Sequence, residues 1–304
     1  MRVLVLMSTY NGEKYLREQI DSILNQVGVE VYLLIRDDGS NDSTCMIIDE
    51  YVRKHKNIEV VKGDNVGFVK SFSQLVAIGI KNKVQADFFS FSDQDDVWMS
   101  CKLKRAYNVL VKENQDYPLL FSSNSIYVDE HMNEMDKFHE KEPFRTKENV
   151  MVYPTEQGCS MVFNRKAAEI FSNYSPINDI PHDRWIHMLC NFLGNTFYEH
   201  QPLFYYRIHG KNAIGKKVGI LNRIINDIVF FFSSKSNHRE YTKDFLMSFH
   251  SLLSIDSVSI IDIYLKYPKV LKYKLKMIFD INYCGSLDIW TRIRKTILIL
   301  FNKL

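Results

Sequence analysis

Three carboxylates follow one another closely after a short apolar run. Residues 88–91 are mostly aromatic and are bounded by polar residues, which indicates a buried strand, and Asp93, Asp95 and Asp96 come directly after it. In open α/β sheets, ligands bind beyond the carboxyl ends of the strands. Adjacent carboxylates repel one another and raise one another's pKa values unless a cation lies among them. The spacing therefore predicts a site for a divalent cation.

A helix cap, a calcium-binding loop and a phosphatase motif would each require particular residues around this acidic run. Asp95 or Asp96 could cap a helix over residues 97–112. An EF-hand loop starting at the first carboxylate would need Gly at its sixth position and Glu at its twelfth, where Trp98 and Lys104 stand, so an EF-hand is excluded. A phosphatase of the haloacid-dehalogenase kind also has Asp-x-Asp-x-Val after an apolar strand. That motif normally follows the first strand, whereas earlier strand–helix units precede it here, so the phosphatase stays an alternative.

Length and composition indicate a large α/β domain with an appendage. The chain has 304 residues, 46% of them hydrophobic and 25% charged, which is enough for a core without disulfides. Its five cysteines are scattered, with no Cys-x-x-Cys pair, so we expect reduced thiols and no zinc site. No apolar run approaches the ~18 residues of a spanning helix, and the N-terminal run is too short for a signal peptide. We therefore expect a cytoplasmic protein.

The charge is distributed unevenly along the chain. Residues 1–215 hold 24 Lys and Arg against 29 Asp and Glu, a net charge of −5, and residues 216–304 hold 15 against 7, a net charge of +8. A basic, aromatic-rich tail on an acidic body suggests two separate roles.

Four strand–loop–helix units occupy the first part of the chain. The expected strands are residues 3–7, 29–35, 58–62 and 88–91, and the expected helices are residues 15–24, 45–56, 70–81 and 97–112. Units in this order predict a doubly wound, mostly parallel α/β sheet with right-handed crossovers. The loops after the strands should then meet at one edge of the sheet.

Four of these loops, residues 8–12, 37–42, 65–67 and 92–96, resemble the nucleotide-binding half of the GT-A type glycosyltransferases, specifically the inverting family-two group. Three later segments, residues 157–164, 181–185 and 206–215, resemble the acceptor half of its bacterial rhamnosyltransferase-like subgroup. The resemblance implies a domain over residues 1–215, with a nucleotide half of about 1–115 and an acceptor half of about 116–215. A helical region over residues 216–304 follows, and it matches nothing that can be carried over.

The resemblance also implies roles for individual residues. Asp183 would be the catalytic base, and Asp95 would bind Mn²⁺ or Mg²⁺ together with His209. The expected nucleotide-binding residues are Thr9, Tyr10, Asn11, Asp38, Asn65 and Asp93. Residues expected near the acceptor or the phosphates are Asp96, Cys159, Ser160, His182, Arg207 and Lys211.

Several of these residues could also have a purely structural role. Asp38 could accept the N3–H of uracil or thymine, or it could only shape the turn before Gly39, although Asp37 is the better turn residue. Asp183 could only cap its helix. A lone histidine such as His209 is also common as an ordinary surface or core residue.

The tail, residues 216–304, alternates apolar helical segments with lysine and arginine. It could lie on a membrane surface, because lipid-linked acceptors are usual for such enzymes and anionic lipids attract basic side chains. It could equally form a helical bundle or a homodimer contact. Nucleic acid is a poor candidate partner, because the body is acidic and carries no binding motif.

The sequence thus predicts a metal-dependent inverting glycosyltransferase at the cytoplasmic face of the membrane. It would move a rhamnose or hexose from a UDP- or dTDP-sugar to a saccharide acceptor in bacterial capsular or other surface polysaccharide synthesis. A sugar nucleotidyltransferase would need a Gly-rich phosphate loop after the first strand, which residues 8–12 do not provide. A scaffold subunit with a vestigial nucleotide site remains the non-enzyme alternative.

Overall fold

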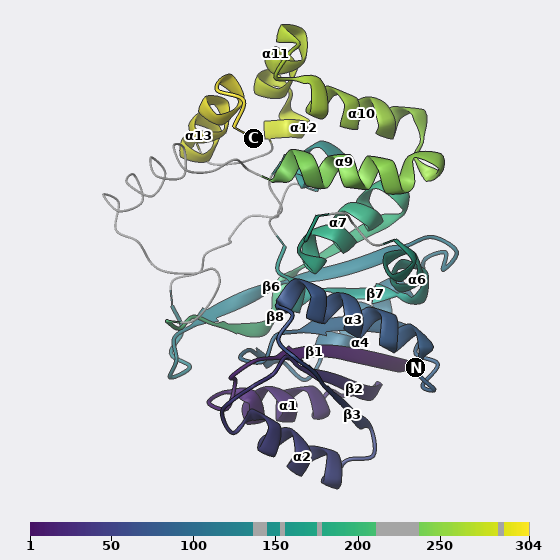
Figure 1. Ribbon diagram of the computed structural model, residues 1–304, viewed down its shortest axis with the longest axis vertical. Coiled ribbons are helices and arrows are strands. Elements are labelled where there is room, and N and C mark those ends of the chain that lie inside the picture. Colours follow the sequence, from purple (N-terminus) through teal and green to yellow (C-terminus); the bar gives the residue numbers. More distant parts are fainter. Residues whose placement is uncertain (136–144, 153–155, 175–177, 211–236, 285–288, 304) are drawn as a thin grey trace. The chain divides into compact units, whose positions relative to one another are not determined.

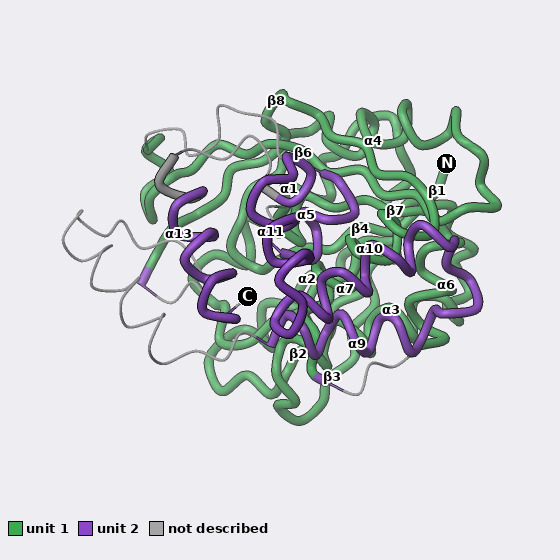
Figure 2. The backbone as a smooth tube through the Cα atoms, turned by 90° about the horizontal axis from the view of Figure 1, so that it is seen from above, with its two compact units in different colours: residues 1–142, 156–175, 179–209 green, residues 143–155, 176–178, 210–304 purple. Residues whose placement is uncertain are grey.

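The computed structural model describes residues 1–135, 145–152, 156–174, 178–210, 237–284 and 289–303. The chain divides into two compact units, which Figure 2 shows in different colours. The first unit consists of residues 1–142, 156–175 and 179–209, and the second of residues 143–155, 176–178 and 210–304. The domain boundary expected at residue 215 lies outside the described residues.

The first unit is built on an eight-stranded sheet in the order β3-β2-β1-β4-β7-β6-β8-β5. Its strands are β1 (Arg2–Thr9), β2 (Glu30–Asp37), β3 (Ile58–Lys62), β4 (Phe88–Ser92), β5 (Val97–Trp98), β6 (Leu119–Val128), β7 (Val162–Asn164) and β8 (Asn195–Arg207). Strands β1 to β4 pair in parallel, as do β6 and β8, while β7 and β5 pair antiparallel to their neighbours. The sheet is therefore mixed and mostly parallel, as the sequence predicts.

Helices cover both faces of this sheet because the strands alternate their side chains between two cores. Val3 and Val5 of β1 belong to the core that includes apolar residues of α1 and α2, while Leu4 and Leu6 face Gly79 of α3. Figure 1 shows α1 and α2 on one side of β1–β3 and α3 on the other. The helices and the short helical turn of this unit are α1 (Leu16–Leu24), α2 (Thr44–Lys54), α3 (Phe68–Lys81), α4 (Lys102–Leu110), η1 (Gly158–Ser160), α6 (Arg165–Asn173) and α7 (His182–Leu193).

One element differs from the prediction. The expected helix over residues 97–112 begins only at Lys102, after a short strand, β5, whose Val97 and Trp98 pair with Tyr205 and Phe204 of β8. The N-cap position of the helix is occupied by Cys101, which makes no side-chain cap hydrogen bond, and not by an acidic residue. The hypothesis that Asp95 or Asp96 caps this helix is therefore wrong, and a strand pairing distant in sequence is the reason.

The second unit is helical in its described parts. It contains α5 (Lys147–Val152), α9 (His238–Phe249), η2 (His250–Leu252), α10 (Ile255–Lys266), α11 (Leu271–Phe279), α12 (Ile281–Cys284) and α13 (Ile289–Leu300). Buried aromatic side chains form its interior, among them Phe245, Phe249, Tyr264 and Tyr267. Across the described ranges, the helices are too short or too polar for any of them to span a bilayer.

Candidate active site

The acidic loop after β4, residues 93–96, is held in place by hydrogen bonds from two directions. The side-chain amide of Gln94 accepts a hydrogen bond from the Tyr10 backbone N–H at 2.9 Å and donates one to its carbonyl at 3.0 Å, which joins the loop to the end of β1. From β8, Arg207 Nε donates to the carbonyl of Asp95 at 2.9 Å. Gln94 and Arg207 thus hold the backbone of the loop, and the Asp96 carboxylate also accepts the Arg207 backbone N–H at 3.3 Å.

Asp95 and His209, the two predicted metal ligands, lie side by side. Asp95 Oδ2 is 2.8 Å from His209 Nε2, although the residues are 114 positions apart in the sequence. The Tyr15 ring lies 5.0 Å from the imidazole ring, centroid to centroid, and 4.5 Å from the Arg207 guanidinium. Both side chains are partly exposed. A carboxylate oxygen and an imidazole nitrogen are ligand atoms that suit a divalent cation.

Arg207 is buried and binds other parts of the protein, whereas the sequence predicts that it contacts phosphate. Its side chain is 3% exposed, and besides Asp95 it donates to the carbonyl of Glu130 at 3.3 Å and to the carboxylate of Glu18. Its donors therefore point at the protein. Lys211, the other basic residue expected to meet phosphate, lies outside the described residues.

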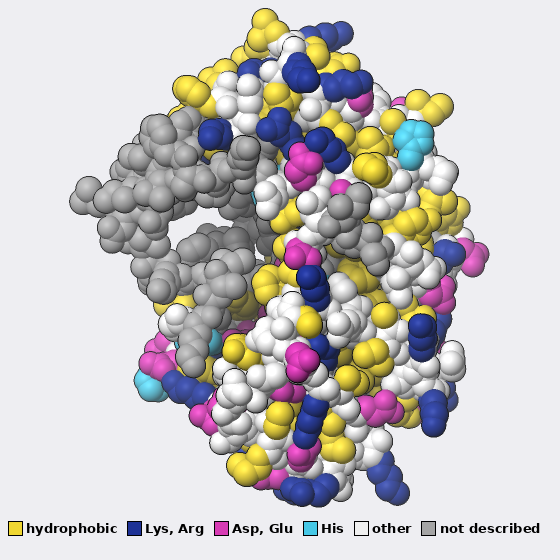
Figure 3. Space-filling view, in the orientation of Figure 1, with side chains coloured by type: hydrophobic (Ala, Val, Ile, Leu, Met, Phe, Trp, Pro, Cys, Tyr) yellow, Lys and Arg dark blue, Asp and Glu magenta, His cyan; other side chains and the backbone are white. Residues whose placement is uncertain are grey.

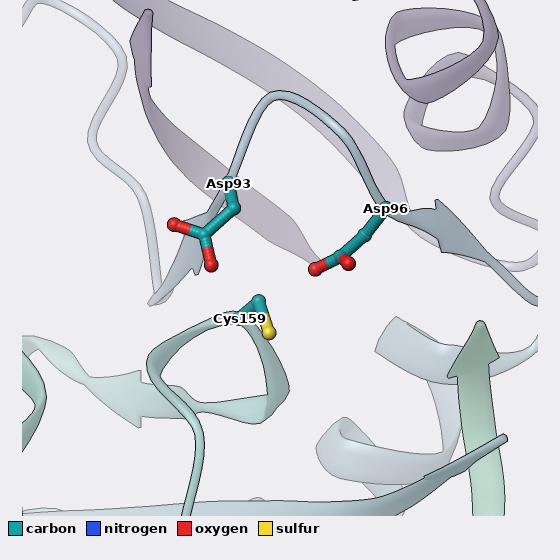
Figure 4. Close-up of side chains that lie close together, drawn as sticks. All are labelled: Asp93, Asp96 and Cys159. Atoms are coloured by element: carbon teal, nitrogen blue, oxygen red, sulfur yellow. The ribbon is translucent and has the colours of Figure 1, made fainter. Parts of the chain in front are cut away.

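Two carboxylates and a thiol next to Asp95 in the fold form a compact cluster (Figure 4). One potential ligand atom each from Asp93, Asp96 and Cys159 lies within 4.8 Å of the others. Burial, and then the charges of Asp95 and Asp93, raise the pKa of Asp96 well above its usual range. Burial and the charges of Asp95 and Asp183 likewise raise the pKa of Asp93. Asp93 and Asp96 thus share one buried cluster, whereas Asp95 pairs with His209 at a partly exposed position.

A buried lysine accompanies this cluster. Lys102 is fully buried, with its ammonium 3.4 Å from the centroid of the Trp98 ring and 3.4 Å from Ser90 Oγ. Burial lowers its pKa to about 7, against the charges of Cys159 and Asp96, which raise it. Lys102 thus lies inside the fold and interacts electrostatically with Cys159 and Asp96 of the cluster.

Asp183 stands in the first turn of α7, behind which His182 is packed in the core. The His182 ring stacks on Phe72 at 3.8 Å and meets Phe91 edge-on at 4.6 Å, centroid to centroid. Burial lowers its pKa to about 4, so the imidazole is neutral at pH 7. A Cβ added at Gly158 would lie 2.8 Å from His182 Nε2 and 3.2 Å from the Asp183 Cβ. The turn at Gly158 therefore fits closely against both residues.

The surroundings of Asp183 bear on two expectations, that His182 lies near the acceptor and that Asp183 could only cap its helix. Because His182 is only 5% exposed, it supports Asp183 from within the fold and offers little surface to an acceptor. The N-cap of α7 is Pro181, without a side-chain cap, and Asp183 Oδ1 accepts a hydrogen bond from the next backbone N–H, that of Arg184, at 2.7 Å. Asp183 is therefore inside the helix rather than at its cap. Its carboxylate is close enough to Asp93 to raise the pKa of that residue.

Asp38, at the end of β2, organises the loop after β3. It is buried, its carboxylate pairs with Arg36, and it accepts the backbone N–H groups of Val66 and Gly67 at 2.9 Å each. Asn65, in the same loop, is exposed and bonds Gly67 N–H at 3.2 Å. Asp38 thus joins the loops that follow β2 and β3. It has this structural role whether or not it also binds a ligand.

Asp37 shapes the turn, as the sequence predicts, because Ser40 donates to it from both its backbone and its hydroxyl, at 2.9 and 2.6 Å. Thr9 is 1% exposed and donates its hydroxyl to Asp37 at 3.0 Å, which gives it a supporting place rather than one open to a ligand. Asn11 links the first two loops through its Oδ1 and the Asn41 N–H at 2.9 Å. Tyr10 alone among the first-loop candidates is well exposed, at 46%.

Three supporting residues were missed by sequence reasoning: Arg36, Gln94 and Lys102. Gln94 is the middle residue of Asp-x-Asp, and Arg36 directly precedes the paired aspartates, so position next to a motif was the available signal. Ser160, which the sequence places near the acceptor, is buried. Its hydroxyl donates to the carbonyl of Gln157 at 2.7 Å, so it shapes its turn.

Comparison with known proteins identifies the family of this chain. The family model described as "Glycosyl transferase family 2" matches residues 4–171, which run from β1 to α6. A protein named dTDP-rhamnosyl transferase RfbG, from Shigella flexneri, is 29% identical over 225 residues, covering 70% of this chain and 74% of that protein. An uncharacterized glycosyltransferase of Methanocaldococcus jannaschii is 27% identical over 252 residues, covering 80% of this chain and 81% of its own.

Solved structures share the fold. The S. aureus TarS 1–349 structure in complex with UDP-GlcNAc has a TM-score of 0.57 at 15% identity, covering 98% of this chain and 90% of that one. The mannosyltransferase PcManGT from Pyrobaculum calidifontis, in complex with GDP-Man and Mn²⁺, has a TM-score of 0.50 at 12% identity, covering 99% and 88%. The family model covers more than half of the chain, and the acidic loop lies at the sheet edge where parallel strands end. This protein is a glycosyltransferase of the GT-A fold and belongs to glycosyl transferase family 2.

Proposed function

We propose that this enzyme transfers a sugar from a UDP- or dTDP-sugar to a saccharide acceptor, with inversion at the anomeric carbon and with a divalent cation. The observation that carries the proposal is the pairing of Asp95 with His209 at 2.8 Å, at the edge of the sheet where Asp93 and Asp183 also meet. Sugar transfer has two needs: the negative charge of the leaving diphosphate must be neutralised, and the attacking hydroxyl must lose its proton.

The metal-binding pair suits the first need. A cation such as Mn²⁺ or Mg²⁺, held by Asp95 and His209, would neutralise the charge that develops on the leaving diphosphate. The protein keeps this pair in position through the Arg207 bond to the Asp95 backbone and through the Tyr15 ring beside His209. Asp93 stands next to this pair on the same loop and is the residue we assign to the ribose.

Asp183 suits the second need. An alcohol is a poor nucleophile at neutral pH, and a positioned carboxylate that removes its proton typically contributes about 10²–10⁴-fold in rate. Asp183 is partly exposed, while His182 behind it is neutral and packed between aromatic rings. We assign Asp183 the acceptor's proton and His182 the task of holding the start of α7 in position.

The donor and acceptor classes follow from different observations. The name of the Shigella flexneri relative points to a dTDP-sugar and the TarS complex contains UDP-GlcNAc, whereas the PcManGT complex contains GDP-Man. We assign a pyrimidine nucleotide, following the Shigella flexneri relative, because its identity to this chain, 29%, is higher than that of either solved structure. Asp38 could accept the N3–H that uracil and thymine share and cytosine lacks. We assign the acceptor to lipid-linked saccharides of bacterial surface polysaccharide synthesis at the cytoplasmic face, as the sequence resemblance implies.

The alternatives fit less well. A haloacid-dehalogenase phosphatase would place its acidic motif after the first strand, whereas three strand–helix units precede β4 here. A vestigial scaffold subunit would be expected to lose one of the two key carboxylates, and both Asp95 and Asp183 are present.

Donor binding can be tested by thermal stability. A ligand that binds only the folded state adds about 2.7 kcal/mol at 100 times its dissociation constant. We expect UDP- or dTDP-sugars to raise the melting temperature with Mn²⁺ or Mg²⁺ present and to do so much less in excess chelator. The Asp95→Asn variant should lose this metal-dependent increase and keep its ligand-free melting temperature, whereas the Asp116→Asn control, with the same change at an exposed site, should behave as wild type. Equal stabilisation of wild type with and without chelator would refute the metal-binding assignment.

A further inference from the structure

Helix α11, in the second unit, has an apolar stripe on its exposed side. Leu271, Leu275 and Phe279 are 70%, 46% and 78% exposed, and their spacing of four residues places them along one face of the helix. Met277, at another angle around the axis, is completely buried and anchors the helix to its unit. The stripe is therefore not the face that packs into the unit.

Lysines flank this stripe on α11 and just before it. Residues 269–279 include four lysines and no acidic residue. Lys269, Lys272 and Lys276 are exposed, while Lys274 donates to the carbonyl of Leu300 at the end of α13 at 3.2 Å. In Figure 3, hydrophobic and basic side chains lie next to one another over α11. This is the composition of a helix that lies at a membrane interface, with apolar side chains toward the acyl chains and lysines toward the head groups.

A second exposed apolar line is present on α13, which contacts α11 in the same unit. Ile293, Ile297 and Leu300 are 45%, 42% and 51% exposed, at spacings of four and three residues. Scattered exposed apolar residues are normal on soluble proteins, but regular stripes on two neighbouring helices indicate a binding surface.

We propose that the α11 surface, defined as Leu271, Leu275 and Phe279 with Lys269, Lys272 and Lys276, docks the protein onto an anionic lipid membrane. Charge decides between this occupant and a second copy of the chain. Two copies meeting through this surface would bring like-charged lysines together, whereas anionic lipid head groups complement them. Membrane docking would bring the enzyme to a lipid-linked acceptor, and only this purpose rests on the proposed function.

The test is vesicle co-sedimentation of the full chain, without donor or acceptor, so that its outcome is independent of sugar transfer. The vesicles are phosphatidylcholine alone or phosphatidylcholine mixed with phosphatidylglycerol. We expect binding to the anionic vesicles only, weakened by salt. A lysine near an anionic surface contributes about 1 kcal/mol, so Lys272→Gln and Lys276→Gln should each weaken binding about fivefold. Leu275→Glu should weaken it more, because it removes apolar insertion and adds a repelled charge.

Matched controls make the result specific. Ile255→Glu makes a comparable change at an apolar residue of α10 that is 88% exposed, and Lys243→Gln removes a lysine that pairs with Glu240; neither should change vesicle binding. Circular dichroism and melting temperature confirm that each variant is folded. Equal binding of wild type and Leu275→Glu would overturn the proposal. So would a wild-type dimer, measured by light scattering, that Leu275→Glu dissociates while vesicle binding is absent.

Discussion

Three aspartates that are close neighbours in the chain acquire different chemical characters from their surroundings. Asp95 meets His209 at the partly exposed edge, Asp96 is buried with its pKa raised, and Asp93 has its pKa raised by burial and by neighbouring acids. Lys102 is buried near this cluster, and burial lowers its pKa to about 7. The three carboxylates are therefore compatible because burial and mutual repulsion raise the pKa values of Asp93 and Asp96, so the three groups do not all carry full charge.

The buried imidazole of His182 should make the stability of the fold depend on pH. Its pKa is lowered from 6.5 to about 4 by burial, so between these values the unfolded chain binds a proton that the folded chain does not. The free energy of unfolding should therefore fall as the pH falls through this window, with a slope from this group of up to about 1.4 kcal/mol per pH unit. His182→Phe should remove that part of the slope in urea unfolding measured from pH 7 to pH 4.

The matched control is His131→Phe, which replaces a side chain that is 76% exposed. It should leave the pH dependence of wild type in place. If His182→Phe and wild type lose stability in parallel as the pH falls, the buried neutral imidazole does not cause the loss of stability between pH 7 and pH 4.

At the scale of elements, the turn η1 packs closely against the start of α7. Its Gly158 leaves no room for a Cβ, which would lie 2.8 Å from His182 Nε2. Gly158→Ala should therefore displace the start of α7, lowering the transfer rate at least tenfold and the free energy of unfolding by about 1–3 kcal/mol. Gly210→Ala is the control, because nothing lies within 4 Å of its added Cβ.

Donor binding separates the two parts of the site in the same experiment. Asp95 and His209 stand on other elements than η1, so metal-dependent stabilisation by the donor should persist in Gly158→Ala. A Gly158→Ala enzyme with wild-type turnover would show that the close fit of η1 against α7 has no catalytic importance.

The elements show what sequence can and cannot predict. The strand at residues 88–91 is confirmed as β4 because its apolar run is local and is bounded by polar residues. Strand β5 has only two residues, and it exists because Val97 pairs with Tyr205. No periodicity within a short window reveals such a pairing, which is why a helix was expected there.

For the molecule as a whole, convergence of the β1, β2 and β4 loops was predictable from topology, since the carboxyl ends of parallel strands share an edge. The approach of His209 to Asp95, across 114 residues, was not; only the family resemblance suggested it. The burial of Lys102 was also unpredictable, because a lysine in a helix is ordinarily expected at the surface.

The central claim is that one site has separable parts: Asp95 with His209 for the donor's diphosphate, and Asp183 for the acceptor's proton. The most direct test measures transfer to a lipid-linked saccharide and metal-dependent donor stabilisation on the same preparations of wild type, Asp183→Asn and Asp95→Asn. We predict that Asp183→Asn lowers kcat by about 10²–10⁴-fold while donor stabilisation stays intact, and that Asp95→Asn loses both. Near-normal transfer by Asp183→Asn, or undiminished metal-dependent stabilisation of Asp95→Asn, would contradict the account.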